Sequence, residues 1–388
     1  MKIAVICSDI GIRIPGSKGA SIHLQSICNA FVALGHEVLL VGVAGHGDPP
    51  ENFASLLLPH PGRSEGLRRE VRKLRFNRRM FQLAMPVVRE FAPDVIYERL
   101  ALFGTAGLRL SREMGVRHVL EINSLLTDEE VAWRSLRLRR LARKRENRVL
   151  RGSHLRIAVS EQLSQKVEKR CGLKVACVPN GVETELFLEM PVRGDAREAL
   201  GLPAGVPLVG FTGSLRPWHG LDVAIDALRM LDEVELAVAG GGDLKQELQA
   251  RAAQLGVAER VHWLGQLPHS QIPSFLAAVD VAVAPYPSLD DFAYSPLKLY
   301  EYLASGTPTV ASSIGQIPDI LDGFGILVSP GESVELAAAI QHILDHRSEA
   351  VERAARGRKW VLAHHGWTQR AQDIIAMISL EARHAVAH

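Results

Sequence analysis

Short apolar runs alternate with amphipathic helical patterns along the first half of the chain. The run KIAVIC at positions 2–7 is followed by a helical pattern from about Ala20 to Leu34, which stops at Gly35. Glycine is common just past a helix end, because it adopts the left-handed conformation without steric cost. The later apolar runs are EVLLVGV, PDVIYE, HVLEIN and RIAVS. Strands that alternate with helices in this way predict a parallel sheet covered by helices on both faces.

The same rhythm restarts in the second half. A stretch rich in Pro and Gly at about 189–207 favours a domain boundary. The apolar runs beyond it are PLVGFTGS, VELAVAGGG, VHWLG, VDVAVAPYP, TPTVAS and GILVS. We therefore predict an α/β protein with two Rossmann-like, doubly wound parallel-sheet domains, 1–187 and 188–366. A final helical pattern at 367–388 can pack back on the first domain. Because open parallel sheets bind ligands at the carboxyl ends of their strands, the expected site is the cleft between the domains.

The composition narrows the class of protein. The chain has 388 residues, of which 47% are hydrophobic and 23% charged, and this excludes collagen-like, disordered and disulfide-scaffold classes. No uncharged apolar stretch reaches the ~18 residues of a membrane-spanning helix, and the N-terminus reads as a strand rather than a signal peptide. The four cysteines lie in apolar segments without metal-site spacing, so we expect buried thiols. These features predict a soluble cytoplasmic protein.

The charge is unevenly distributed, although the formal net charge is only +2 and does not favour general nucleic-acid binding. Eight basic and two acidic residues lie between Arg63 and Arg79, and nine basic and one acidic between Arg134 and Arg151. The simplest interpretation is two solvated helix faces. The alternative is a patch that attracts an anionic acceptor or a membrane surface, which would make the protein peripherally membrane-associated.

The segment DDFAYSPLKLYEYLASGTPTVASS at 290–313 carries the most chemical information. Ser295 is a preferred N-cap and Pro296 a preferred first helical residue, so a helix N-terminus is expected at a strand end, where it suits a phosphate. Lys298 can add its ammonium there. Glu301, on the same helical face, can accept hydrogen bonds from sugar hydroxyls. The alternative is a capped helix with an ordinary Lys–Glu pair. Asp290-Asp291 is interpreted as a solvated loop pair.

Two glycine-rich loops of the second half follow strands. The loop GSLRPWHG at 213–220 opens a helix, and its Arg216 can bind phosphate oxygens while His219 can donate to an oxyanion. The alternative is a tight turn with exposed Arg and His. The loop AGGGD at 239–243 lacks the GxGxxG spacing of a dinucleotide site, and Gly241 and Gly242 are expected to let a ligand approach the backbone.

Taken together, these segments resemble the retaining, nucleotide-sugar-dependent glycosyltransferases of family four, which have the GT-B fold. KGASIHLQSICNAFVALGHEV resembles the family's glycine loop and first helix, IAVSEQL and VPNGVETELF its domain-linking signature, and PLKLYEYLASGTPTVAS its donor-binding helix. The family usually has two glutamates in the donor motif. Glu301 matches the second, which the resemblance makes the ribose-binding carboxylate, and Ala293 stands in place of the first.

Two further departures concern charge. The family's diphosphate-binding Arg and Lys are replaced by Ser214 and His219, so Arg216 and Lys298 are the expected substitutes. Asn123 stands where the first domain often carries a His. The sequence resembles a bacterial subgroup that has an SPLK donor helix and a WHG loop.

The resemblance implies transfer of a hexose-type sugar from a nucleoside diphosphate sugar, first of all a UDP-sugar, to a hydroxyl acceptor, with retention and without a metal or cofactor. The expected catalytic residues are Arg216, His219, Lys298 and Glu301. The expected donor contacts are Gly213, Ser214, Gly241, Gly242, Gly265, Gln266, Leu267, Ser295, Pro296 and Leu297. The expected acceptor contacts are Lys18, Gly19, Ala20, His23, Glu98 and Asn123. Two other functions stay open: a GT-B-like epimerase or phosphorylase, and a nucleotide-sugar-binding protein without turnover.

Overall fold

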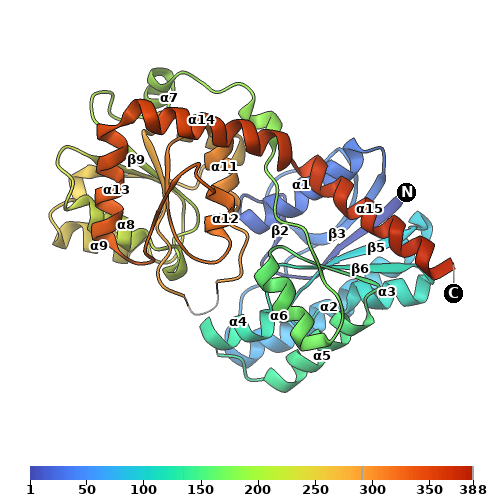
Figure 1. The fold of residues 1–388 in the computed structure, drawn as a ribbon. Helices are drawn as coiled ribbons and strands as arrows, with labels where there is room; N and C mark the ends of the chain where they lie inside the picture. The colour runs from blue at the N-terminus through green and yellow to red at the C-terminus, as the bar shows by residue number, and fades with distance from the viewer. Residues whose placement is uncertain (134, 290–291, 387–388) are drawn as a thin grey trace.

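The computed structural model describes residues 1–133, 135–289 and 292–386, which form two parallel sheets with helices on both faces of each (Figure 1). The predicted solvated pair Asp290-Asp291 lies outside the described residues, as does Arg134. Every apolar run predicted as a strand forms one. The predicted fold class is confirmed.

The first sheet has the strand order β2-β3-β1-β5-β6-β7-β8, with β4 paired to β3. Its strands are β1 (Lys2–Cys7), β2 (Arg13–Ile14), β3 (Glu37–Ala44), β4 (Ala54–Leu58), β5 (Val95–Arg99), β6 (Arg117–Ile122), β7 (Leu155–Ala158) and β8 (Ala176–Cys177). The helices around it are α1 (Gly19–Ala33), α2 (Gly66–Phe91), α3 (Ala106–Met114), α4 (Leu126–Trp133), α5 (Arg139–Gly152) and α6 (Glu161–Cys171). The short strands β2, β4 and β8 were not predicted from the sequence.

The second sheet has the order β11-β10-β9-β12-β13-β14. Its strands are β9 (Leu208–Thr212), β10 (Glu235–Ala239), β11 (Val261–Gly265), β12 (Val281–Ala284), β13 (Thr309–Ser312) and β14 (Ile326–Val328). The helices that follow β8 are α7 (Arg193–Ala199), α8 (Leu221–Leu228), α9 (Lys245–Gln254), α10 (Ile272–Ala278), α11 (Leu297–Ser305), α12 (Ile317–Leu321), α13 (Ser333–Asp345), α14 (Arg347–His364) and α15 (Trp367–Val386). The strand order reverses between β9 and β12, so the loops after these two strands meet at the ligand-binding edge.

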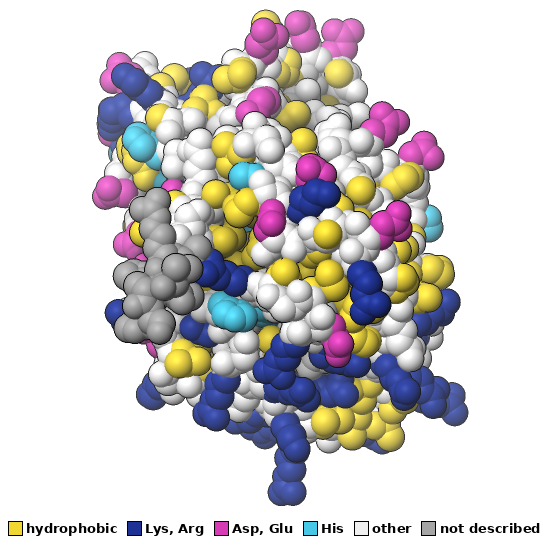
Figure 2. Space-filling model, turned by 90° about the vertical axis from the view of Figure 1, so that its right-hand side faces the viewer, with side chains coloured by type: hydrophobic (Ala, Val, Ile, Leu, Met, Phe, Trp, Pro, Cys, Tyr) yellow, Lys and Arg dark blue, Asp and Glu magenta, His cyan; other side chains and the backbone are white. Residues whose placement is uncertain are grey.

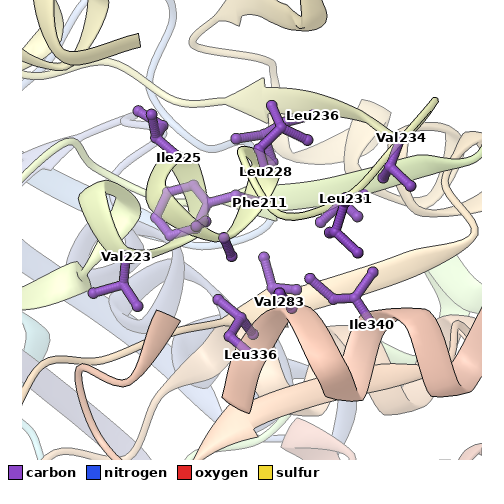
Figure 3. Packing of buried hydrophobic residues seen from close by; sticks show 14 of the residues in the cluster. Phe211, Val223, Ile225, Leu228, Leu231, Val234, Leu236, Val283, Leu336 and Ile340 are labelled. Atoms are coloured by element: carbon purple, nitrogen blue, oxygen red, sulfur yellow. The ribbon is translucent and has the colours of Figure 1, made fainter. Parts of the chain in front are cut away.

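Both faces of the second sheet are packed with apolar side chains. On one face, Phe211 of β9 and Val283 of β12 pack against residues of α8 and α13, among them Leu228 and Leu336 (Figure 3). The opposite face packs against α10 and α11. Burial on both faces explains why these strands are continuous apolar runs rather than alternating ones. The sheet is therefore a rigid support for the loops at its edge.

The chain crosses twice between the two sheets, and the crossings are paired. The amide of Val182 donates to the carbonyl of His365 at 2.8 Å, and the amide of Trp367 donates back to Val182 at 3.2 Å. Beyond this pair, α15 runs along the first domain beside α1 (Figure 1). Its apolar residues, including Trp367 and Ile374, join the core that also contains β1 and α1. The C-terminal helix thus fastens the second crossing to the first domain.

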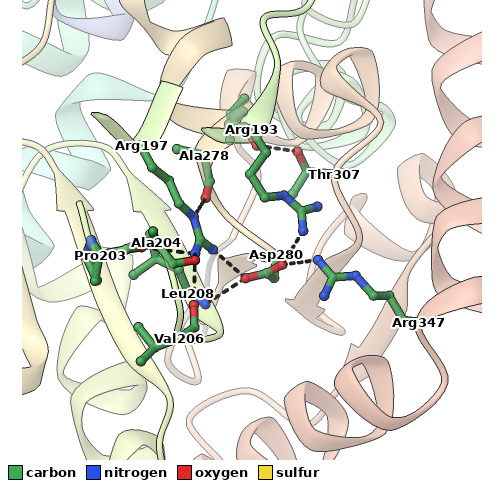
Figure 4. Close-up of polar contacts among 11 residues, drawn as sticks. Arg193, Arg197, Pro203, Ala204, Val206, Leu208, Ala278, Asp280, Thr307 and Arg347 are labelled. Carbon is green, nitrogen blue, oxygen red and sulfur yellow. Dashed lines mark hydrogen bonds and ion pairs between the residues drawn. The ribbon is translucent and has the colours of Figure 1, made fainter. Parts of the chain in front are cut away.

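The stretch predicted to contain the domain boundary includes helix α7, which an acidic residue ties to the second sheet. Asp280, just before β12, accepts hydrogen bonds from Arg193 at 2.6 Å and Arg197 at 2.7 Å, and from Arg347 of α14 (Figure 4). The amide of Leu208 adds a fourth donor at 2.9 Å. Asp280 therefore anchors α7, β9 and α14 at the amino ends of the strands, away from the ligand-binding edge.

Candidate functional site

A buried lysine lies at the switch point of the second sheet. Lys298, the second residue of α11, is 8% exposed, and its Nζ finds no hydrogen-bond partner among the described residues. The ammonium lies 4.1 Å from the centre of the Phe211 ring and 5.5 Å from that of Tyr286. A Cβ on Gly213 would come within 2.9 Å of Nζ, and Gly213 has φ +135°. Glycine is thus required here both for its backbone conformation and for the close approach of Lys298.

Burial makes this ammonium unusually acidic. Desolvation lowers the pKa of Lys298 to about 7, and the charge of Glu301 opposes that shift only in part. A cation that is desolvated and lacks a hydrogen-bond acceptor interacts strongly with an anion that enters its surroundings. The predicted role of Lys298 as a phosphate-facing cation is therefore consistent with its position at the loop after β9.

His219 lies beside this lysine but does not carry the predicted positive charge. Its Nδ1 is 2.6 Å from the carbonyl oxygen of Ser214 and must hold the proton, because a carbonyl only accepts. Burial and the neighbouring Lys298 lower the pKa of His219 to about 3. At neutral pH its Nε2 is consequently an acceptor. The expectation that His219 donates to an oxyanion is corrected: the ring holds the loop closed through Ser214.

Arg216 is turned toward the neighbouring glycine-rich loop. Its Nη1 lies 2.5 Å from Oδ2 of Asp243, and the aspartate is 81% exposed. Exposed ion pairs contribute little, about 0–1 kcal/mol, so a diphosphate could replace Asp243 at low cost. Arg216 lies near enough to His219 to affect its titration, and its predicted role stays a prediction.

The N-terminus of α11 is formed one residue later than predicted. Pro296 is the N-cap and Leu297 the first helical residue. Ser295 instead accepts a hydrogen bond from the amide of Asn180 at 3.2 Å, and Asn180 donates to its carbonyl at 2.6 Å. Asn180 belongs to the first crossing between the domains. Ser295 therefore fixes the start of α11 to the crossing, and the expectation that its hydroxyl caps α11 is wrong.

The glycines after β10 have a packing role. Gly241 accepts from the amide of Leu215 at 3.0 Å, and a Cβ on Gly242 would meet the carbonyl of Leu215 at 2.5 Å. Gly242 thus allows close packing of two loops rather than the predicted approach of a ligand. The space beside Gly241 is open, because the nearest atom to a Cβ placed there would be the Cβ of Gln266, at 3.9 Å.

A groove of about 670 Å³ lies between residues of the two domains. Its first-domain wall is the loop with Pro15, Gly16 and Ser17, and its second-domain wall includes Gln266 and Leu267. Gln266 donates to Ser17 across the groove at 2.6 Å. The volume is in the usual range for ligand pockets. The structure thus brings the loop of the expected donor contacts Gly265 to Leu267, with Gly265 at φ +70°, opposite the first-domain glycine loop.

The predicted acceptor residues at the start of α1 lie close to α11. A Cβ on Gly19 would touch Leu297 at 3.4 Å. Lys18 is the exposed N-cap of α1, and Ala20 is half-buried. These three residues lie where the two domains meet.

A carboxylate that the sequence analysis did not select organises the first-domain edge. Glu121, at the end of β6, accepts from His23 at 2.8 Å and from Arg99 at 2.8 Å, and also from Tyr97 and Asn123. Burial raises its pKa, but the charges of His23 and Arg99 and the hydrogen bonds from His23 and Tyr97 outweigh burial and hold the pKa well below its ordinary value. Glu121 lies two residues before Asn123 at a strand end, and that position was the available signal.

His23 is consequently a buried structural residue and not an open acceptor contact. It is 4% exposed, its Nε2 is occupied by Glu121, and its ring meets Trp367 edge-on at 4.7 Å. The small cavity that it lines has about 10 Å³, far too little for a sugar. The prediction for His23 is corrected, because Trp367 of α15 covers it.

Glu98 is likewise corrected. The carboxylate is 1% exposed and accepts the amides of Gly107 and Leu108 at 2.9 and 3.0 Å, at the start of α3. Nε2 of His118 lies 3.0 Å from it. Successive strand residues point to opposite faces, so Glu98 points toward α3 while Arg99 points toward Glu121. Glu98 therefore stabilises the N-terminus of α3 and does not contact an acceptor.

Glu301 is partnered by a histidine from a different loop. Nε2 of His269 lies 2.9 Å from Oε1 of Glu301, and Nδ1 of His269 lies 3.6 Å from Glu183. Neither His269 nor Glu183 was selected from the sequence. No local pattern marks His269, whereas Glu183 lies within the VPNGVETELF segment.

Within the described ranges, no cluster of three or more potential metal-ligating His, Cys, Asp or Glu side chains occurs. In the same ranges, no helix is both long and apolar enough to cross a membrane.

Two family models match the chain, one on each domain. The model described as "Glycosyltransferase Family 4" matches residues 17–186, and "Glycosyl transferases group 1" matches 192–360. A GDP-mannose-dependent alpha-(1-6)-phosphatidylinositol monomannoside mannosyltransferase of Mycolicibacterium smegmatis is 30% identical over 300 residues, or 74% of this chain and 76% of that protein. A 2-deoxystreptamine glucosyltransferase of Streptomyces kanamyceticus is 26% identical over 49% of this chain and 50% of its own length.

Solved structures share the whole arrangement. Sucrose-phosphate synthase from Thermosynechococcus elongatus superposes with a TM-score of 0.80 at 20% identity, covering all of both chains. HepE from Anabaena, solved in complex with UDP, gives 0.72 at 22% identity and covers 98% of this chain and 100% of its own. At these identities the likeness shows the fold, which is GT-B.

Proposed function

This chain belongs to glycosyltransferase family four and is a hexosyltransferase with a nucleotide-sugar donor, and we propose that it transfers a hexose to a hydroxyl acceptor with retention and without a catalytic metal. The observation that carries the proposal is the buried Lys298 ammonium beside Gly213. It lies at the switch point where strand-end loops and the N-terminus of α11 converge. The further assignment to the subgroup with an SPLK donor helix stays a prediction.

In the proposed reaction the bond between the sugar's anomeric carbon and the diphosphate breaks as the acceptor oxygen attacks on the same face. The acceptor proton passes to the departing diphosphate oxygen. Negative charge builds on the diphosphate, and preorganised cations and helix N-H groups at that position lower the barrier. Lys298 and the N-terminus of α11 supply this charge, and Arg216 joins them by exchanging Asp243 for phosphate. The first-domain loop closes over the donor and excludes water.

Nucleotide binding without metal is the first expected outcome. The relatives' names include a GDP-mannose-dependent enzyme, and HepE was solved with UDP, so we expect UDP or GDP to raise the melting temperature, because a ligand that binds the native state stabilises it. The measurement is a thermal-shift series with UDP, GDP, ADP, CMP and dTDP, each in Mg²⁺ and in EDTA. A shift that disappears in EDTA would contradict metal independence, and the anomeric configuration of the product, read by NMR, tests retention.

The described residues of the two basic stretches come together where α2 and α5 begin, and we propose that this surface of the first domain holds the protein at an anionic membrane. Glu70 of α2 accepts the amides of Arg137 and Leu138, which brings the start of α2 next to the start of α5. Lysine and arginine side chains gather there with yellow apolar patches among them (Figure 2). Leu67, Leu83 and Leu141 are exposed on these helices. Basic side chains interleaved with apolar ones suit an anionic lipid surface.

Vesicle flotation tests this proposal. Binding to phosphatidylglycerol vesicles is expected, with little binding to phosphatidylcholine vesicles and loss at high salt. Replacing four exposed arginines of this surface by glutamine, namely Arg68, Arg75, Arg78 and Arg140, should reduce binding at least about tenfold, at ~1 kcal/mol per basic residue. Equal flotation with neutral vesicles would show that the surface does not act through its charge.

A further inference from the structure

One histidine lies between two carboxylates that come from different parts of the chain. His269 is in the 3₁₀ turn His269–Gln271 between β11 and α10. Its Nε2 is 2.9 Å from Oε1 of Glu301 on α11, and its Nδ1 is 3.6 Å from Oε2 of Glu183, which follows the first crossing between the domains. The exposed fractions of the three side chains are 16%, 13% and 29%. The contacts are therefore partly shielded from water, which strengthens the electrostatic attraction in each of them.

The series of contacts continues into the first domain. Ser26 of α1 donates its hydroxyl hydrogen bond to Oε1 of Glu183, so four side chains connect α11 with α1. His269 and Glu183 both line the 670 Å³ groove. Ser26 is buried on α1, the helix that also contributes Ile22 and Gln25 to the groove. A carboxylate of the donor helix is thus linked, through His269 and Glu183, to the domain expected to bind the acceptor.

The ring is flanked by negative charge on both nitrogens, and the groups that perturb its titration are Glu301 and Glu183. A neutral imidazole can donate from one nitrogen only, whereas the imidazolium donates from both. Burial lowers the pKa of His269, but the hydrogen bond to Glu301 and the charges of both glutamates outweigh burial and raise it. The protonated ring therefore faces both carboxylates with an N–H group and fixes the rotamer of Glu301 through Oε1.

We propose that His269 is a positioning residue for the donor, which orients Glu301 toward the ribose hydroxyls and connects this orientation to the first domain through Glu183 and Ser26. The inference rests on the proposed function and on the role that the family resemblance implies for Glu301, which is to accept hydrogen bonds from the ribose. The role proposed for His269 resembles that of residues that hydrogen-bond to a metal-ligating side chain and thereby fix the orientation of that side chain. The residue itself touches no reacting atom.

The test uses a ligand that differs only in the groups that Glu301 binds. The ratio of the dissociation constant of 2′,3′-dideoxy-UDP to that of UDP, measured by calorimetry, reports the ribose contact, with GDP and its dideoxy form as the second pair. Glu301→Gln sets the value expected when that contact is weakened. His269→Ala should reduce the ratio about tenfold, the order expected for one charge-assisted hydrogen bond, and His269→Gln, which keeps one donor, should restore part of it.

A matched control lies on the strand before the turn. His262 of β11 pairs with Glu235 of β10 at 2.5 Å, and His262→Gln should leave the ratio unchanged. In the wild type the ratio should fall as pH rises through the pKa of His269, because deprotonation removes a donor. In His269→Gln it should be flat. Glu183→Gln should lower the pH at which the ratio falls, since it removes one of the two charges that favour the imidazolium.

The outcomes separate the inference from the proposed function. A ratio that His269→Ala leaves unchanged overturns the inference, and so does an equal loss of affinity for UDP and its dideoxy form, which would indicate a purely structural role. If the wild type binds neither UDP nor GDP, the proposed function itself fails. If it binds them with a ratio near one, Glu301 does not contact the ribose and the positioning role fails with it.

Discussion

Replacing Lys298 by methionine is expected to lower kcat by about 10²–10³-fold, the cost of removing one preorganised group that stabilises charge in a transition state. Methionine is unbranched, is only one heavy atom shorter than lysine and stays apolar beside Phe211 and Tyr286, so the loss reports mainly the charge. The KM for the acceptor should change little. Steady-state kinetics with varied donor and acceptor measure both effects, and Lys359→Met, at an exposed position of α14, is the control.

The pH dependence of the same variant gives a second readout. The pKa of Lys298 is about 7 in the folded protein and 10.5 for an unperturbed lysine. Above pH 7 the free enzyme loses the ammonium, so kcat/KM for the donor should decline on the alkaline side, and Lys298→Met should lack this limb.

Stability should change in the opposite direction to activity. Between pH 7 and 10.5 the unfolded state binds more protons than the folded one, so wild-type stability gains from this group as pH rises. The variant should therefore melt higher than the wild type below pH 7, and the difference should shrink toward pH 10.5. A variant with normal turnover would remove Lys298 from the mechanism.

Asp280→Ala is expected to destabilise the second domain by about 3–5 kcal/mol, the usual result of leaving a buried charge without its partner. Arg197 is 4% exposed and would lose its carboxylate, keeping only the carbonyls of residues such as Ala278. For a domain of this size the melting temperature should fall by about 10 °C or more. Calorimetry or circular dichroism measures the change.

The control for this prediction is an exposed pair in the same domain. Both carboxylate oxygens of Asp226 accept hydrogen bonds from Arg251, in a bidentate ion pair. The side chain of Arg251 is 46% exposed. Asp226→Ala should therefore cost no more than about 1 kcal/mol. If Asp280→Ala costs as little as Asp226→Ala, the arginines around Asp280 are well solvated after its removal, and the cluster does not anchor α7.

Much of the fold was predictable because its signals are local. The long strands are buried on both faces and read as continuous apolar runs, and Gly35, with φ +81°, ends α1 where predicted. Strands β2 and β8 have only two residues each, too few to produce a pattern. Helix α7 was missed because its short span lies in a Pro- and Gly-rich stretch.

The placement of Lys298 and Glu301 on one helix was predictable for the same reason, whereas their roles toward a donor stay predictions. Lys298 and Glu301 lie on one helix next to a strand end, so their proximity follows from helical spacing. The sequence could not indicate that Lys298 of α11 is buried against Phe211 of β9. Nor could it indicate that His269, from the turn between β11 and α10, contacts Glu301. Such contacts depend on how separate elements pack.

The acceptor side shows the division most clearly. The sequence by itself determined two parallel-sheet domains, the strand ends that carry polar side chains, and helix α11 with its lysine and glutamate. Only the tertiary structure decided which of those side chains face the cleft. Neighbouring residues of β5 point to opposite faces, so Glu98 supports α3 while Arg99 binds Glu121, and α15 returns from the end of the chain to cover His23. Local periodicity specifies elements, whereas the direction and partner of a side chain depend on packing between elements distant in the sequence.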